Sequence, residues 1–317
     1  MSGAEPLVSI VLPTYNRASW LDRAVQSCAG QRYQNWELII VDDCSADETP
    51  EKIAGYADPR IRSIRNERNR KIPGSLNAGF ALARGEYFTW TSDDNCFRRE
   101  AIGEMVAALE ADPGVGLVYA NYTTIDSEDR PMEHVSSTHR IPAAGGPPRE
   151  ADRSPRCITQ RNVVGFCFLY RRSVADAIGT YAEDLFLVED FDYWLRLCSR
   201  YPIKLLDKDL YLAREHPNSL SATRRHDVTV AAVMALEKHL PQLSWLRSGE
   251  LARSYGFAAS EAAAVNDIEA ACRLVRKGMR YSARGVLSTA PPGLVAKALL
   301  PRQVYEFGRR HFGRLLK

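Results

Sequence analysis

Long apolar runs are missing from this 317-residue chain. No stretch of eighteen or more apolar residues occurs, so no membrane-spanning helix is predicted. The first residues, MSGAEPLVSIVLP, lack the basic region of a signal peptide, and their apolar run is too short for one. We therefore expect a cytosolic protein. Internal repeats and low-complexity tracts are also missing, which argues against a solenoid.

Cysteine is sparse and scattered along the chain. The seven cysteines are odd in number and include no CxxC pair, which argues against a disulfide framework and against a zinc knuckle. We predict that they are buried as small hydrophobic residues. They are Cys28, Cys44, Cys96, Cys157, Cys167, Cys198 and Cys272.

Composition and charge divide the chain unevenly. Hydrophobic residues make up 45% and charged residues 26%, which excludes a disordered, collagen-like or coiled-coil chain. The length suggests two units, or one large α/β domain with an appendage. The net charge of +3 conceals an asymmetry, because residues 230–317 hold 14 Lys and Arg against 6 Asp and Glu. The body of the chain is therefore acidic and its tail is basic.

Buried strands alternate with helices, a pattern that predicts an α/β fold with a mostly parallel, Rossmann-like sheet flanked by helices. Leu7–Leu12 and Glu37–Val41 are continuous apolar runs, typical of strands buried on both faces. Further strands are expected over Ile61–Ile64, Glu86–Thr91, Gly116–Tyr122, Asn162–Tyr170, Ile203–Leu206 and Leu210–Ala213. Helices are expected over Ala18–Ala29, 47–56, Pro73–Arg84, Arg98–Asp112 and Glu189–Arg200, and from residue 224 onward with breaks at Pro241, Gly278 and Pro291.

Polar clusters follow three of the predicted strands, at residues 14–16, 42–43 and 93–95. Ligands of parallel sheets bind beyond the carboxyl ends of the strands, so these clusters predict a site at that edge. Asp93 and Asp94 could supply oxygen ligands to Mg²⁺ or Mn²⁺, or they could simply form a turn. Asp43 could bind a base or ribose, or it could belong to a turn that starts a helix.

Six further residues have a functional and a structural interpretation. Tyr15 could stack on a heterocycle or merely pack, and Arg70 and Lys71 could bind phosphate or lie in a solvated loop. Glu189 and Asp190 could include a general base or could only complement the start of a helix. His216 follows a strand and could contact a metal or a phosphate, or do neither.

Together these segments resemble glycosyltransferase family 2, and the resemblance covers approximately residues 7–221. VSIVLPTYNR resembles the opening strand and base-binding turn of that family, and ELIIVDDCSADET its signature VDDGSxDxT, with Cys44 where Gly is common. NRKIPGSLNAGFALARGEYFTWTSDDN resembles the stretch that leads to the metal-binding element. GFCFLYRRSV, EDFDYWLRL and YLAREHPNSLS resemble the acceptor-side, catalytic and closing segments.

The resemblance implies a GT-A catalytic domain over residues 1–223, followed by a helical extension over residues 224–317. It implies that Pro13, Tyr15 and Asp43 hold the nucleotide base. It further implies that Asp94, helped by Asp93, binds a divalent cation on the diphosphate of a nucleotide sugar.

In the same resemblance, Asp190 is the general base of an inverting transfer to a glycan or lipid-linked acceptor. Many family members have an Arg-Asn pair where this chain has Leu76-Asn77. Asn77 would therefore belong to the donor site without its usual Arg neighbour, and Arg70 or Lys71 could take over the phosphate contact.

Three alternatives to a glycosyltransferase are less consistent with the sequence. A sugar-phosphate nucleotidyltransferase would need a Gly-rich loop after the first strand, which PTYNRAS is not. A non-catalytic nucleotide-sugar-binding or scaffold protein need not keep Asp43, Asp94 and Asp190 together. A Rossmann dehydrogenase is excluded because no GxGxxG follows the first strand.

Two segments carry predictions of their own. Residues 140–155 are rich in Pro, Gly and charge and predict a mobile loop over the site. Residues 297–317 hold six Lys and Arg against Glu306 alone, interleaved with apolar residues. Such a helix could lie on the inner face of an anionic membrane or pack on the catalytic domain or on a second copy, and nucleic acid is the least expected partner.

Overall fold

The computed structural model describes residues 5–136, 156–159, 162–217, 219, 223–244, 246–301 and 305. These residues fall into two compact units, one from residues 1–155 and 163–219 and the other from residues 156–162 and 220–317. The division predicted after residue 223 stays a proposal, because compactness does not show that either part folds alone. The predicted loop over 140–155 and most of the predicted basic helix over 297–317 lie outside the described residues.

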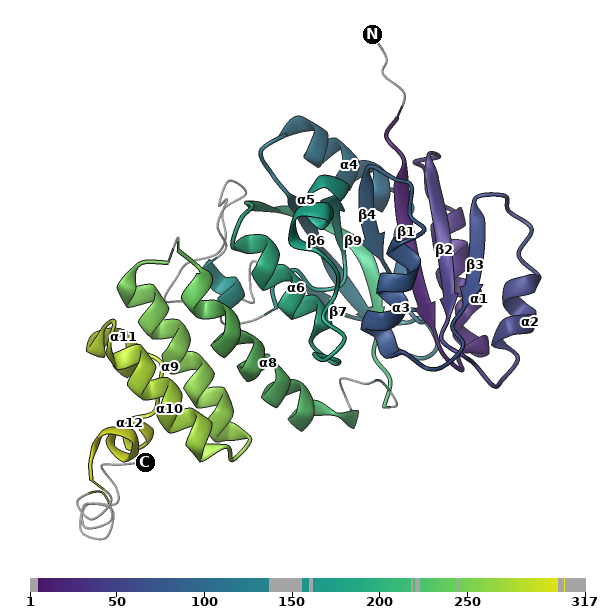
Figure 1. Cartoon of the computed structure of the whole chain (residues 1–317). Coiled ribbons are helices and arrows are strands. Elements are labelled where there is room, and N and C mark those ends of the chain that lie inside the picture. The colour runs from purple at the N-terminus through teal and green to yellow at the C-terminus, as the bar shows by residue number, and fades with distance from the viewer. Residues whose placement is uncertain are drawn as a thin grey trace. The chain divides into compact units, whose positions relative to one another are not determined.

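The first unit is an α/β layer structure with a nine-stranded sheet (Figure 1). Eight strands follow the order β3-β2-β1-β4-β8-β6-β9-β5, and β7 pairs with β6. The strands are β1 (Val8–Thr14), β2 (Trp36–Asp42), β3 (Ile61–Arg65), β4 (Tyr87–Trp90), β5 (Cys96–Phe97), β6 (Leu117–Ile125), β7 (Pro131–Val135), β8 (Phe168–Arg171) and β9 (Ile203–Arg214). The helices are α1 (Ala18–Ala29), α2 (Thr49–Ala54), α3 (Lys71–Phe80), α4 (Ala101–Ala111), α5 (Arg172–Ile178) and α6 (Glu189–Cys198).

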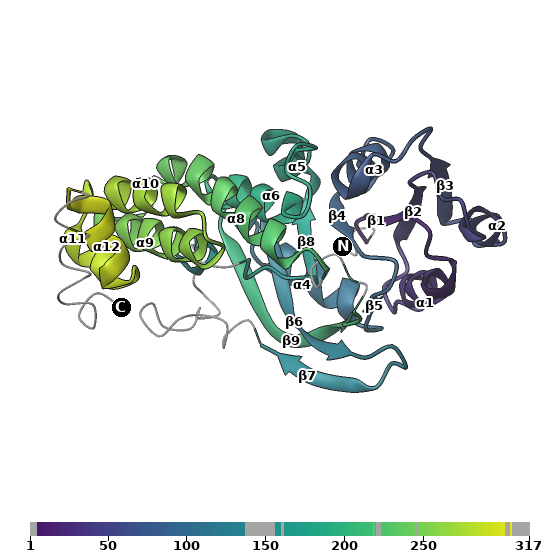
Figure 2. The ribbon, with the colours of Figure 1, turned by 90° about the horizontal axis from the view of Figure 1, so that it is seen from below.

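Strands β3, β2, β1 and β4 form the parallel half of the sheet, as predicted. Helix α3 covers one face of this half, and α1 and α2 cover the other (Figure 2). Gly79 allows α3 to pack closely on the sheet, since a Cβ there would lie 2.5 Å from a methyl carbon of Val11. The parallel arrangement brings the carboxyl ends of β1, β2 and β4 to one edge of the sheet.

The other half of the sheet departs from the predicted strands. The strand expected over Asn162–Tyr170 is reduced to β8, because Gly165 has a positive φ of 65° and turns the chain before Phe168. The two strands expected after Ile203 form the single long β9. Residues 207–209 are polar and separate the two predicted strands. In the structure β9 continues through them, because its register with β6 shifts around Asn121. Strands β5 and β7 and helix α5 were not predicted.

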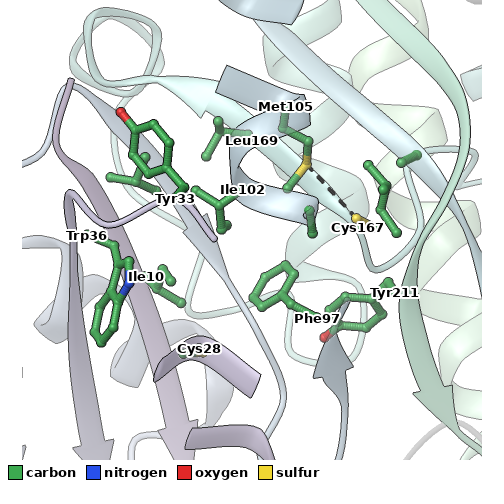
Figure 3. Packing of buried hydrophobic residues seen from close by; sticks show 14 of the residues in the cluster. Ile10, Cys28, Tyr33, Trp36, Phe97, Ile102, Met105, Cys167, Leu169 and Tyr211 are labelled. Carbon is green, nitrogen blue, oxygen red and sulfur yellow. Dashed lines mark hydrogen bonds between the residues drawn. The ribbon is translucent and has the colours of Figure 1, made fainter. Parts of the chain in front are cut away.

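The main hydrophobic core lies between the sheet and helices α1 and α4. Figure 3 shows Ile102 and Met105 of α4 beside Leu169 and Cys167, all of them fully buried. Four cysteines are buried as predicted, Cys28, Cys167, Cys198 and Cys272. Cys44 and Cys96 are only partly buried. Cys44 follows Asp43 in the loop after β2, where the chain turns with a positive φ of 68°.

The second unit is helical. Its helices are α8 (Arg225–His239), α9 (Ser248–Ala264), α10 (Ile268–Met279), α11 (Ala283–Leu287) and α12 (Pro292–Leu299), with 3₁₀ turns η1 (Arg156–Thr159) and η2 (Leu240–Gln242). The break predicted at Pro241 falls in η2, and Pro291 immediately precedes α12. Helix α10 ends one residue after Gly278. Within the described part of the chain, no helix has the length and apolarity needed to cross a membrane.

Candidate functional site

The turns after β1 and β2 are joined by hydrogen bonds. The amide of Asp43 donates to the carbonyl of Thr14 at 2.9 Å, and the amide of Asn16 donates to the hydroxyl of Ser45 at 2.9 Å. The amide of Ala46 returns a bond to the Asn16 side chain at 2.7 Å. Asn16 tolerates the positive φ of 53° that this turn requires. The two turns therefore form one rigid platform.

Tyr15 and Pro13 lie at this platform. Tyr15 lies between Thr14 and Asn16, which make these bonds, and its side chain is 46% exposed. An aromatic ring exposed at the carboxyl edge of a parallel sheet is suited to stack on a planar ligand. Pro13 is half-buried in β1, opposite Val41 of β2, and its ring supports the start of the turn.

The Asp43 carboxylate organises the loop that leads into α3. Its Oδ1 accepts hydrogen bonds from the Asn66 side chain and the Arg70 amide, both at 2.8 Å. Its Oδ2 accepts one bond from the Lys71 amide, at 2.9 Å. A carboxylate has about four acceptor positions, so Oδ2 retains room for one further donor such as a ring N–H of a base.

The side chains of Arg70 and Asn77 contact the segment before α6. Arg70 forms an ion pair with Glu183 at 2.7 Å, with the guanidinium 36% exposed. The side-chain Nδ2 of Asn77 donates to the backbone carbonyl of Tyr181 at 3.0 Å, and its Oδ1 accepts from the backbone amide of Tyr181 at 2.9 Å. Asn77 thus fixes the backbone at Tyr181, and its predicted contact with a donor stays a prediction. Lys71 begins α3 with a positive φ of 64°.

Asp93 and Asp94 follow β4 in different environments. Asp93 is buried, and burial together with the charge of Asp94 raises its pKa to about 7. The Asp94 carboxylate is partly exposed, and its Oδ2 lies 3.1 Å from Nε2 of His216. The structure therefore brings together Asp94 and His216, which are 122 residues apart in the chain.

The side chains of Asp94 and His216 are donors that a divalent cation can take. Their separation of 3.1 Å is that of a hydrogen bond or ion pair, and a carboxylate and an imidazole are both ligands of Mn²⁺ in proteins. Among the described residues no group of three or more His, Cys, Asp and Glu could hold a metal ion. Two protein ligands suffice for an ion whose remaining positions are taken by phosphate oxygens and water.

Helix α6 begins with two adjacent carboxyl groups. Leu187, just before them, has a positive φ of 85°, which is strained for a leucine. Glu189 is buried, and its Oε2 has no hydrogen-bond partner among the residues that the structure describes. Burial and the neighbouring charge of Asp190 raise the pKa of Glu189 above its ordinary value. Asp190 is only partly buried and can meet a ligand.

Two residues of this site escaped the sequence predictions. Asn66, which binds Asp43, directly follows β3 and could have been found by the same argument that singled out the other strand ends. Arg214 ends β9, and its side chain is fully buried beside Asp94. Arg214 directly follows the strand predicted over 210–213, so the same argument from strand ends could have found it.

The site thus has two groups of residues whose members make direct contact. One joins Asp43 to the backbone of Arg70 and Lys71, and the other joins Asp94 to His216. The segment from Tyr181 to Asp190 contacts the first group through the ion pair of Glu183 with Arg70, and Asn77 of α3 binds Tyr181 and Glu183 of the same segment. This edge therefore offers an exposed aromatic ring at Tyr15 and a hydrogen-bond acceptor for a base at Asp43. It also offers two candidate cation ligands, Asp94 and His216, and the partly exposed carboxylate of Asp190.

Comparison with known proteins identifies relatives of this chain. The model of the family described as Glycosyl transferase family 2 matches residues 9–179, more than half of the chain. An uncharacterized glycosyltransferase of Rickettsia felis is 29% identical over 214 residues, which cover 67% of this chain and 34% of the relative. The succinoglycan biosynthesis protein ExoO of Rhizobium meliloti is 33% identical over 139 residues, 43% of this chain and 40% of ExoO. The chain therefore spans only a third to two fifths of these relatives.

Solved structures share the fold. Residues 1–349 of S. aureus TarS, in complex with UDP-GlcNAc, superpose with a TM-score of 0.67 at 15% identity, covering 96% of this chain and 92% of TarS 1–349. The mannosyltransferase PcManGT from Pyrobaculum calidifontis, in complex with GDP-Man and Mn²⁺, has a TM-score of 0.54 at 17% identity. The superposition covers 97% of this chain and 88% of PcManGT. At such identities the likeness concerns the fold, which confirms the predicted GT-A architecture with C-terminal helices.

Proposed function

This chain belongs to glycosyl transferase family 2, and from that premise we propose that it transfers a sugar from a nucleoside-diphosphate donor to a hydroxyl group of a glycan or lipid-linked acceptor. The observation that carries the proposal is the contact that brings the carboxylate of Asp94 to the imidazole of His216 at the edge where Tyr15 and Asp43 also lie. A dinucleotide or a simple phosphate ester would not require all four. Relatives with GT-A folds bind UDP-GlcNAc and GDP-Man, in line with a nucleotide-sugar donor.

The nucleotide occupies the joined turns after β1 and β2. Tyr15 stacks on the base, Pro13 supports that turn, and the remaining acceptor position of Asp43 receives a ring N–H. Arg70 and Lys71 lie at the amino end of α3, where backbone dipoles and side-chain charge both favour a diphosphate. Arg70 must exchange its ion pair with Glu183 for a phosphate to make this contact.

Asp94 and His216 would hold the divalent cation, helped by Asp93. A cation bound there offsets the charge of the departing nucleoside diphosphate. The imidazole ligand favours Mn²⁺ over Mg²⁺, which prefers oxygen ligands alone. PcManGT was solved with Mn²⁺, in line with this choice.

Asp190 removes the proton from the acceptor hydroxyl. As that O–H bond breaks, the acceptor oxygen forms a bond to the anomeric carbon, and the bond from this carbon to the diphosphate oxygen breaks on the opposite face. The product is a glycoside of inverted configuration, the nucleoside diphosphate leaves, and the proton stays on Asp190. The raised pKa of Glu189 favours its neutral form, which lessens the repulsion between the two adjacent carboxyl groups.

A thermal-shift screen of the full chain against UDP, GDP, dTDP and CMP, each with and without Mn²⁺, tests the proposal. One nucleoside diphosphate should raise the melting temperature, and Mn²⁺ should increase the shift. A ligand at a hundredfold its Kd contributes about 2.7 kcal/mol, which corresponds to several degrees for a unit of this size. If none of the nucleotides shifts the transition in either condition, the donor class is wrong.

The basic C-terminal helices are the proposed contact with an anionic membrane. Residues 270–301 hold six Lys and Arg and no Asp or Glu. Arg280, Arg284 and Lys297 are exposed, and so are the apolar side chains of Tyr281 and Leu287. Each basic residue near such a surface contributes about 1 kcal/mol. This contact would place the enzyme at the inner face of the membrane, where lipid-linked acceptors of polysaccharide synthesis occur, and the name of ExoO supports such a pathway.

Vesicle co-sedimentation tests the membrane contact. The full chain should sediment with vesicles that contain phosphatidylserine and should stay in solution with purely zwitterionic vesicles. The double substitution Arg280→Glu and Arg284→Glu should weaken sedimentation at least tenfold, because it reverses two charges. Equal sedimentation of both proteins would favour the alternative, in which these helices contact a second copy of the chain.

A further inference from the structure

Arg214, the last residue of β9, is buried and fully engaged at the predicted cation site. Its Nε donates to the backbone carbonyl of Asp94 at 3.0 Å, and its Nη1 donates to the backbone carbonyl of Asp126 at 2.5 Å. Its Nη2 forms an ion pair with Asp129 in the turn between β6 and β7. The backbone amide of Arg214 donates to the Asn95 side chain at 2.7 Å. One residue therefore fixes both the Asp94-Asn95 turn and the hairpin turn.

Arg214 is also connected to His216 through Trp20 of α1. The guanidinium carbon lies 4.4 Å from the centre of the Trp20 ring. The Trp20 ring is stacked against the imidazole of His216, with centres 6.0 Å apart and an angle of 19° between the planes. Trp20 thus contacts both side chains, and its flat face limits the rotation of His216.

The chemistry of the contacts requires a guanidinium. Its planar fork presents several N–H groups at fixed angles, so one side chain can donate to two carbonyls and a carboxylate at once and still stack on an indole. A lysine would keep the charge, but its N–H donors all lie on one nitrogen and cannot reach these separate acceptors at once. A buried charge without these partners would be unfavourable, and this explains why Asp129 and the two carbonyls converge on it.

We propose that Arg214 is a positioning residue that sets the spacing of Asp94 and His216 for a divalent cation. It acts on Asp94 through the backbone carbonyl and on His216 through Trp20, and it touches neither metal nor substrate. The inference rests on the proposed function, since it assumes that this pair binds the cation. Partners that orient metal ligands in this way typically contribute 10–100-fold to metal affinity.

Mn²⁺ titration followed by electron paramagnetic resonance tests the inference. The full-length protein is titrated with MnCl₂ alone, with UDP and with GDP, and free Mn²⁺ is counted from its six-line signal. Arg214→Lys should raise the Kd for Mn²⁺ by about 10–100-fold while leaving the Kd of the metal-free nucleotide unchanged. Arg130→Lys is the matched control, because Arg130 lies in the same hairpin and its side chain is 73% exposed. The Arg130→Lys protein should bind Mn²⁺ with the same Kd as the wild type.

A second pair of variants keeps the test decisive if Arg214→Lys fails to fold. Trp20→Leu should weaken Mn²⁺ binding in the same direction, and Trp20→Phe, which retains a flat ring beside His216, should restore most of it. If folded Arg214→Lys and Trp20→Leu proteins both bind Mn²⁺ like the wild type, the inference is wrong and the proposed function stands. If the wild type itself binds no Mn²⁺ under any of the three conditions, the metal assignment and the inference are both wrong.

Discussion

Replacing Asp190 with Asn should abolish sugar transfer and leave donor binding nearly intact. General-base catalysis typically contributes about 10²–10⁴-fold to a rate, and an amide cannot take up the proton. The Asn side chain can still accept the hydrogen bond that the Phe191 amide donates to Asp190 at 2.7 Å, so the start of α6 should be preserved. Transfer is measured as release of nucleoside diphosphate in the presence of a lipid-linked acceptor extract, and binding by calorimetry with the same nucleotide.

Glu189→Gln is the matched control for this prediction. Because the pKa of Glu189 is raised in the folded chain, its contribution to stability is fully present below the unfolded pKa of about 4.3 and is lost as the pH rises through the folded pKa. Gln reproduces the neutral form, so this variant should keep transfer within a few-fold near neutral pH. Its melting temperature should fall less than that of the wild type as the pH rises from about 4.3 to about 8. Transfer that survives Asp190→Asn would show that another group is the base.

Replacing Asp94 with Ala should remove the enhancement of nucleoside diphosphate binding by Mn²⁺. The substitution deletes one of two proposed protein ligands and leaves the backbone carbonyl that Arg214 binds. Loss of a residue that merely orients a metal ligand costs about 10–100-fold in affinity, so loss of the ligand itself should cost at least as much. Calorimetric titration with nucleotide, with and without Mn²⁺, measures the difference directly.

Asp176→Ala is the control for the loss of a carboxylate. Asp176 lies on α5 with a 70% exposed side chain, and its one described ion pair, to Arg172, has a separation of 4.0 Å. Exposed pairs of this kind contribute little to stability, so this variant should bind nucleotide and Mn²⁺ like the wild type. Titrations of Asp94→Ala that match the wild type would remove Asp94 from the metal site.

The parallel half of the fold was predictable because its signals are local. Leu7–Leu12 and Glu37–Val41 are uninterrupted apolar runs, and only a strand covered on both faces explains them. The antiparallel half was harder to predict. Residues 207–209 are polar enough to suggest a turn, and only the register shift against β6 allows β9 to continue through them.

Position in the sheet, rather than residue type, made the candidate site predictable. Asp43, Asp94 and Tyr15 each follow a strand, so they could be placed at one edge before any contact was known. Their individual surroundings could not be inferred. The burial that raises the pKa of Asp93 and leaves Asp94 accessible is a property of the packed turn, since the two residues are adjacent in the chain and identical in type.

The sequence by itself determined the fold class, the family and the edge of the sheet where ligands are expected. It could do so because hydrophobic periodicity and polar clusters at strand ends involve residues that are close together in the chain. The tertiary structure alone decided which of these residues work together. Asn77 lies 104 residues from Tyr181, and Arg214 lies 120 residues from Asp94. Contacts at such separations depend on the strand order of the sheet, so no local pattern could reveal that Asn77 fixes a backbone segment or that Arg214 binds the backbone of Asp94.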